Sequence, residues 1–156
     1  MKYDNLSPII LFTYNRLEEL KKTIAALQNN KLANYSVLYV YSDGAKTDND
    51  NIAVEAVRDF LNTVSGFKEV VLTFSAKNKG LASSIIEGVT TILQKHGKVI
   101  VLEDDLLVSD NFLSFMNSGL DYYYNNSSIL SICGYNMKVE KQILDNYLFD
   151  MFFAKR

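Results

Sequence analysis

Residues 98–106 read Lys-Val-Ile-Val-Leu-Glu-Asp-Asp-Leu, an apolar run that ends in three consecutive acids, Glu103, Asp104 and Asp105. Continuous aliphatic runs rich in β-branched residues are typical of parallel strands buried on both faces. In open α/β sheets, ligands bind at the carboxyl ends of such strands. Adjacent carboxylates repel one another unless a cation or hydrogen-bond donors lie among them, and a hard divalent metal ion is the simplest partner. The stretch therefore predicts a buried strand that opens onto a site.

The rest of the chain repeats this pattern of apolar runs followed by polar residues. Further runs that predict strands cover residues 8–12, 37–41, 70–74 and 129–133. Apolar residues at helical spacing lie between them, at residues 17–27, 53–64, 81–96 and 112–123. Strands that alternate with helices are typical of βαβ units with right-handed crossovers. The sequence thus predicts an α/β fold with a mostly parallel sheet.

Composition limits the classes of function. The chain has 156 residues, of which 48% are hydrophobic and 22% charged, as expected for one globular domain. A net charge of -2 with no basic stripe argues against nucleic-acid binding. The N-terminus lacks an apolar signal core and no apolar run could span a bilayer, so we expect no transmembrane segment and a cytoplasmic protein, free or peripheral to a membrane.

Two further features concern single stretches. Cys133 is the only cysteine, which leaves neither a disulfide framework nor a zinc cluster, and its apolar neighbours predict a small buried side chain.

Residues 147–153 are strongly apolar close to the last residue, Arg156. Because such an end would be an unusual exposed patch, we expect the chain to be the N-terminal part of a longer protein.

Polar side chains follow each of the first four predicted strands, and in a parallel sheet they meet at one edge. These side chains are Thr13, Asn15 and Arg16, then Asp43, then Lys77, Asn78 and Lys79, and finally Glu103, Asp104 and Asp105. Basic groups and amides suit phosphate, a carboxylate such as Asp43 suits a base N–H or a ribose hydroxyl, and the three acids suit a cation that bridges phosphates. The edge therefore indicates a nucleotide diphosphate.

The chain lacks the signature motifs of several classes of nucleotide-binding protein. No glycine follows the first strand, which argues against a dinucleotide-binding dehydrogenase and a P-loop enzyme. A nucleotidyltransferase would also need a glycine-rich loop at that place. A phosphoacceptor domain of the flavodoxin-like type would need an acidic pair there, where the chain has Thr13-Tyr14-Asn15-Arg16.

Four segments together resemble the nucleotide-sugar half of a GT-A glycosyltransferase of family 2. They are Pro-Ile-Ile-Leu-Phe-Thr-Tyr-Asn-Arg at 8–16, Ser-Asp-Gly at 42–44, Asn-Lys-Gly-Leu at 78–81 and Val-Leu-Glu-Asp-Asp at 101–105. The triplet is similar to the metal-binding D-x-D motif of N-acetylglucosaminyltransferase I, with Glu103 as a departure in the first position. The resemblance covers residues 8–136. It implies a three-layer α/β/α, Rossmann-like fold, and one nucleotide-sugar-binding domain over residues 1–156.

The resemblance also implies a role for each candidate residue. Asp105 would coordinate Mn²⁺ or Mg²⁺ on the diphosphate, Asp104 would hold the ribose or a metal-bound water, and Asp43 would recognise the uracil or the ribose. The remaining donor-binding candidates are Thr13, Asn15, Arg16, Lys79 and Glu103. The donor would be a UDP-sugar and the acceptor a saccharide or another hydroxyl compound. By the same resemblance, we expect the acceptor surface and the catalytic base to be supplied by residues beyond this half of the enzyme.

Alternatives stay open at this stage. The acidic triplet can be a solvated turn, Asp43 and Gly44 can form an ordinary turn, and Lys79 can belong to a solvated loop. Arg16 can pair with Glu18 or Glu19 on the first turn of its helix. For the whole chain, the two remaining functions are a metal-dependent glycosyltransferase donor domain and a non-catalytic binding or interaction module of the same fold.

Overall fold

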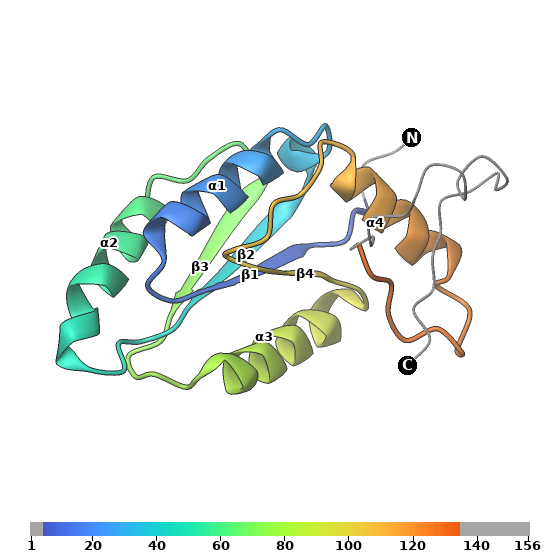
Figure 1. Cartoon of the computed structure of the whole chain (residues 1–156). Helices are drawn as coiled ribbons and strands as arrows, with labels where there is room; N and C mark the ends of the chain where they lie inside the picture. The colour runs from blue at the N-terminus through green and yellow to red at the C-terminus, as the bar shows by residue number, and fades with distance from the viewer. Residues whose placement is uncertain (1–4, 135–156) are drawn as a thin grey trace, which may run out of the picture.

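Four parallel strands form the central layer of the structure, a computed structural model that describes residues 5–134 (Figure 1). The strands are β1 (Ile9–Thr13), β2 (Val37–Ser42), β3 (Glu69–Phe74) and β4 (Ile100–Glu103). Their order in the sheet is β3-β2-β1-β4, and every neighbouring pair is parallel. The prediction of an α/β fold with a parallel sheet is confirmed.

Helices cover both faces of this sheet. They are α1 (Leu17–Gln28), α2 (Asn51–Leu61), α3 (Leu81–His96) and α4 (Phe112–Tyr122), with short 3-10 turns η2 (Ala33–Tyr35) and η3 (Asp48–Asp50). In Figure 1, α1 and α2 lie on one face and α3 lies on the other. Gly97 ends α3 in the left-handed conformation, with φ of 74°. None of the helices in residues 5–134 is long and apolar enough to cross a membrane.

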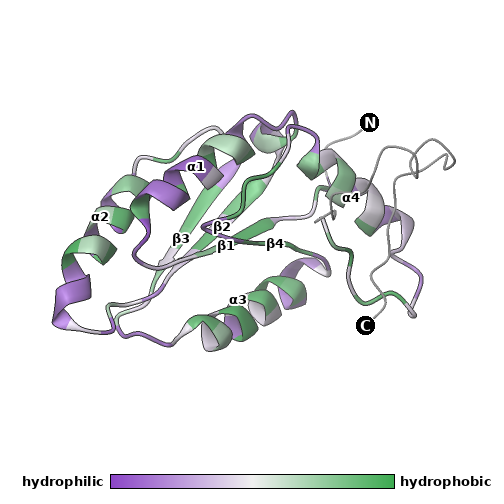
Figure 2. Ribbon diagram, viewed as in Figure 1, coloured by the Kyte–Doolittle hydropathy of each residue, from purple (hydrophilic) through white to green (hydrophobic). Residues whose placement is uncertain are grey.

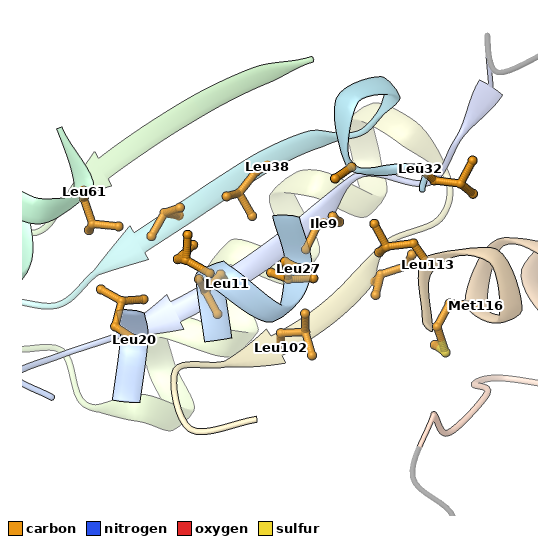
Figure 3. Packing of buried hydrophobic residues seen from close by; sticks show 14 of the residues in the cluster. Ile9, Leu11, Leu20, Leu27, Leu32, Leu38, Leu61, Leu102, Leu113 and Met116 are labelled. Carbon is orange, nitrogen blue, oxygen red and sulfur yellow. The ribbon is translucent and has the colours of Figure 1, made fainter. Parts of the chain in front are cut away.

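The alternation of side chains along the strands builds two cores. Ile9 and Leu11 of β1 pack with α1, α2 and α4 in the larger cluster, part of which is drawn in Figure 3. Ile10 and Phe12 point to the opposite face and pack against Ile92 of α3. Figure 2 shows that β1 and β2 are largely hydrophobic, whereas the helices carry both hydrophobic and hydrophilic residues. Because both faces of β1 are covered, its five residues are all buried and the strand reads as one apolar run.

Three expectations at the β4 side of the sheet are wrong. Residues 129–133 form no strand within the described part of the chain, although their composition favours one. Cys133 is exposed. Val101 is 41% exposed, because β4 has only β1 as a strand neighbour among residues 5–134. A short apolar run specifies a strand only where a neighbouring strand receives its backbone hydrogen bonds.

The single histidine of the chain, His96, lies in a cluster with Tyr39 and Lys95. Lys95 Nζ donates to the Tyr39 hydroxyl over 3.1 Å, and that hydroxyl lies 3.0 Å from His96 Nε2. An ammonium group can only donate, so the Tyr39 hydroxyl accepts from Lys95 and has its own hydrogen to donate when His96 Nε2 carries no proton. Partial burial lowers the pKa of His96, and the charge of Lys95 lowers it further.

We expect an NMR titration of His96 to give a pKa below the ordinary value of about 6.5. Since the unfolded chain then takes up the proton more readily, this group's contribution to stability is present above pH of about 6.5 and is lost as the pH falls below it. Because the chain has one histidine, its ring signals need no assignment. A pKa at or above about 6.5 would contradict the neutral ring.

Candidate functional site

The carboxyl ends of the strands surround a pocket of about 300 Å³. Its lining comes from the ends of β1, β2 and β4, the loop after β3 and the start of α3. The polar lining residues include Thr13, Arg16, Asp43, Asn78, Glu103 and Asp104. The structure thus brings residues from all four predicted strand ends to one pocket.

Asp104 is the buried centre of one wall. Its side chain is 2% exposed. It accepts a hydrogen bond from the Thr13 hydroxyl over 2.8 Å and one from the Tyr14 amide over 3.3 Å. Its own carbonyl oxygen accepts from the Thr23 hydroxyl of α1 over 2.8 Å. These bonds fix the end of β4 to the end of β1 and to α1.

Arg16 joins two of the three acids. Its Nη2 pairs with Asp104, and its Nη1 donates to Asp105 Oδ2 over 2.8 Å. Burial lowers the pKa of Arg16, but the charges and hydrogen bonds of Asp104 and Asp105 outweigh it, so the net pKa is raised. The guanidinium therefore stays charged and compensates the adjacent carboxylates. Arg16 therefore pairs with these two aspartates rather than with Glu18 or Glu19 of its own helix. Glu18 pairs with Lys21 instead.

Asp43 ties the second strand end to the loop after β3. Its carboxylate accepts from the amides of Gly44, Lys79 and Gly80, at distances of 2.9 to 3.1 Å. The side chain of Asn78 donates to the Gly44 carbonyl over 2.8 Å. A side chain at Gly44 would lie 2.5 Å from the backbone of Lys77, so only glycine allows this approach. The two loops form one unit, which we call the Asp43 wall (residues 43–46 and 75–80).

Aromatic rings line the pocket between these walls. The rings of Phe12 and Tyr41 are 5.7 Å apart, and both residues line the pocket together with Tyr14. The Tyr14 hydroxyl accepts from the Lys46 amide over 2.9 Å. Burial and the nearby carboxylates of Asp50 and Asp43 raise the pKa of Tyr14 against the opposing effect of that amide, so the phenol stays neutral at physiological pH.

The other predicted residues lie at different places around the pocket. Glu103 lines it, whereas Asp105 lies on the turn beyond β4, where the Leu106 amide donates to the Glu103 carbonyl. Asn15 donates its side-chain amide to Asp50 over 3.4 Å. Lys79 contributes its backbone to the Asp43 wall, while its ammonium pairs with Glu87 of α3 at 2.7 Å. Asn15, Lys79 and Asp105 are not among the residues that line the pocket in the described structure.

The acidic side of the pocket suits a hard cation that also contacts a phosphate ligand. Both carboxylate oxygens of Asp104 already accept hydrogen bonds, but Asp105 uses Oδ2 on Arg16 and its side chain is 43% exposed. Within residues 5–134, no three His, Cys, Asp or Glu side chains gather into a complete metal site. Mg²⁺ is commonly held by one or two carboxylates together with substrate phosphates and water, so the exposed Asp105 and the pocket-lining Glu103 fit such a site by their chemistry.

Sequence reasoning missed Tyr14 and Lys46 as lining residues. Both line the pocket, and apart from Arg16, Lys46 is the one cation in the lining that the structure describes. Among residues 5–134, no ion pair engages its ammonium group. Tyr14 lies between Thr13 and Arg16, so its position in the sequence indicates a place in the pocket. Lys46 lies in an ordinary polar link, and nothing in the sequence around it indicates a ligand site.

The comparison with protein families bears on this pocket. The family model described as glycosyl transferase family 2 matches residues 9–147, which is most of the chain and includes every element around the pocket. The chain belongs to glycosyl transferase family 2. The family is described as one of glycosyl transferases, and its match includes the strand ends and loops that surround the pocket.

A solved structure supports the fold of this family 2 domain. The crystal structure of S. aureus TarS is similar to it with a TM-score of 0.54 and 15% sequence identity over 76% of this chain. The chain spans 20% of the length of that TarS chain. No curated protein matches the sequence. At this identity the likeness establishes the Rossmann-like α/β fold alone.

Proposed function

We propose that this family 2 domain binds a UDP-sugar together with Mn²⁺ or Mg²⁺, as the donor for sugar transfer to a saccharide or another hydroxyl acceptor. The observation that carries the proposal is one pocket with two chemically different walls. The Asp43 wall offers carboxylate and amide groups beside aromatic rings, and the opposite wall offers the carboxylates of Glu103 and Asp104 with Arg16, which also pairs with Asp105 outside the lining.

The first wall suits a pyrimidine nucleoside. The rings of Phe12, Tyr14 and Tyr41 provide the apolar surface that a base needs. The Asp43 carboxylate already receives four contacts from three backbone amides, two on each oxygen. A base N–H or a ribose hydroxyl would share one of these oxygens with an amide. Asp43 is 9% exposed, so a ligand group must enter the pocket to reach it.

The second wall suits the diphosphate. Arg16 is 47% exposed and can turn part of its guanidinium toward phosphate oxygens, and Lys46 adds a second positive charge. Asp105 and Glu103 would hold the cation, which when bound would stabilise the negative charge of the departing diphosphate. Asp104, through its bonds to Thr13 and Tyr14, keeps the two strand ends together beneath these groups.

The transfer exchanges one carbon–oxygen bond for another. The bond from the anomeric carbon to the diphosphate oxygen breaks, and its electron pair leaves with UDP. The acceptor hydroxyl oxygen supplies the electron pair of the new bond to the anomeric carbon, and its proton passes to a general base. Within the chain, the proposed part of this reaction is donor binding and stabilisation of the leaving group.

Calorimetry of the purified chain with UDP, with and without Mn²⁺, tests the proposal. We expect binding that is saturable and at least about tenfold tighter with the cation. Titration with ADP is the matched comparison for the base, and weaker binding of ADP is expected. UDP binding that is absent or indifferent to Mn²⁺ would overturn the proposed metal-dependent donor site.

Lys46 gives a separate prediction. The Lys46→Met variant should bind UDP about three- to tenfold more weakly, because an exposed charge contributes about 1 kcal/mol to an ion pair. The affinity of the variant should also depend less steeply on salt, since one fewer charge is screened. Lys31→Met is the matched control, because Lys31 is an exposed lysine in the turn after α1 and carries the same charge. An equal loss in both variants would mean a general charge effect.

A further inference from the structure

Arg58 of α2 is a further cation close to the pocket, and its bonds differ from those of Arg16 and Lys79. Its side chain is 17% exposed, although it lies on a helix at the rim of the sheet. Its Nη2 donates to the carbonyl of Ser75 over 2.7 Å and to the carbonyl of Asp43 over 3.3 Å. Its one ion pair among the described residues is a 3.5 Å contact with the exposed Glu55.

These bonds join the ends of two strands. Asp43 directly follows β2 and Ser75 directly follows β3. The guanidinium also lies over the ring of Phe74, the last residue of β3, at 5.2 Å from the ring centre. A planar group with several donors can hold two carbonyls and a ring at once, which a lysine ammonium cannot do.

We propose that Arg58 is a positioning residue for the donor pocket, acting through the Asp43 wall rather than by touching the ligand. This inference rests on the proposed function of the pocket. Arg58 holds residues 43 and 75 at one end of the wall, and the amides of Lys79 and Gly80 meet Asp43 at the other. Without the guanidinium, the two loops lose their common support and the Asp43 carboxylate loses its fixed place.

Exposure and charge fit this role. A largely buried guanidinium bonded to main-chain carbonyls is costly to desolvate, and its compensation here is the hydrogen bonds and the stacked ring. Arg58 is not among the residues that line the pocket in the described structure, so it reaches a bound nucleotide only through the wall.

The test compares Arg58→Met and Arg58→Lys with the Lys98→Met control. Lys98 is the matched cation, because its side chain is 9% exposed and pairs with Asp121 at 2.5 Å, away from the pocket lining. The first readout is amide hydrogen exchange at Lys79 and Gly80, which needs no ligand. We expect exchange there to be at least about tenfold faster in Arg58→Met, with partial recovery in Arg58→Lys and no change in Lys98→Met. Unchanged exchange in Arg58→Met would overturn the inference.

The second readout compares the affinity for UDP with the affinity for pyrophosphate, in the presence of Mn²⁺. Arg58→Met should bind UDP about tenfold more weakly and pyrophosphate as before, because the disturbed wall is the proposed base side. A general loss of folding would weaken the binding of both ligands. Unchanged UDP affinity together with faster amide exchange would overturn the positioning role. If the unaltered chain binds no UDP, the proposed function fails by itself, and the exchange result still decides whether Arg58 holds the wall.

Discussion

Replacing Asp104 with alanine should lower the free energy of unfolding by about 2–4 kcal/mol, the largest effect on stability that we expect from any change at the site. The side chain is 2% exposed and receives the Thr13 hydroxyl, the Tyr14 amide and the Arg16 guanidinium. The variant leaves the buried Thr13 hydroxyl without its acceptor, and water cannot easily reach it because Thr13 is 6% exposed. Arg16 is half exposed and can turn to solvent, which keeps the loss below that of a fully buried ion pair.

Urea denaturation of Asp104→Ala and Asp105→Ala measures this difference. Asp105 is the matched control because it is the next residue, carries the same charge and pairs with the same arginine, but its side chain is 43% exposed. Its replacement should cost less than about 1 kcal/mol. Equal losses in the two variants would show that the charge of the triplet, rather than the burial of Asp104, determines stability.

The difference between these neighbouring acids illustrates what the sequence could not predict. The apolar run before the triplet correctly predicts a strand, and the parallel arrangement correctly predicts an edge where polar residues meet. The partner of each acid depends on contacts across the chain, such as that between Arg16 and Asp104, which are 88 residues apart. Local spacing favours Glu18 or Glu19 for Arg16, because it contains no information on distant strand ends.

The same reason explains the positions of Asp43 and Lys79. An aspartate before a glycine fits both a turn and a ligand site, and in the structure it accepts backbone amides from a loop 36 residues away. Lys79 contributes its amide to the pocket wall while its ammonium pairs with Glu87, so one residue faces two directions. A sequence pattern treats a residue as one group and cannot separate its backbone from its side chain.

The apolar run at residues 129–133 shows the limit of the strand pattern itself. Composition alone favours a strand there, as it does for β1, but β1 has a strand on each side and these residues have none in the described part of the chain. Connection length does not explain the difference, because α4 before this run and α2 between β2 and β3 both have 11 residues. Pairing with a neighbouring strand, rather than hydrophobicity, therefore distinguishes the confirmed strands from the wrong one.

The Asp105→Asn variant should bind UDP in the presence of Mn²⁺ about 10- to 100-fold more weakly than the unaltered chain, the largest effect on binding that we expect. Asp105 is a largely exposed carboxylate of the acidic triplet, and its second oxygen lies beside the one that accepts from Arg16. Loss of a ligand oxygen weakens binding of the cation, and weaker cation binding lowers the affinity for the diphosphate. Calorimetry with Mn²⁺ measures the loss, and the small stability change expected for this position keeps folding out of the comparison.

Without the cation, the sign of the effect should reverse. In a chelator, the carboxylate of Asp105 only repels the diphosphate and holds one nitrogen of Arg16, so its neutralisation removes a repulsion and frees a donor for phosphate. Asp105→Asn should then bind UDP as tightly as the unaltered chain or more tightly. A loss of equal size with and without Mn²⁺ would mean that Asp105 contacts the nucleotide itself, because only a metal ligand makes the same substitution harmful with the ion and harmless without it.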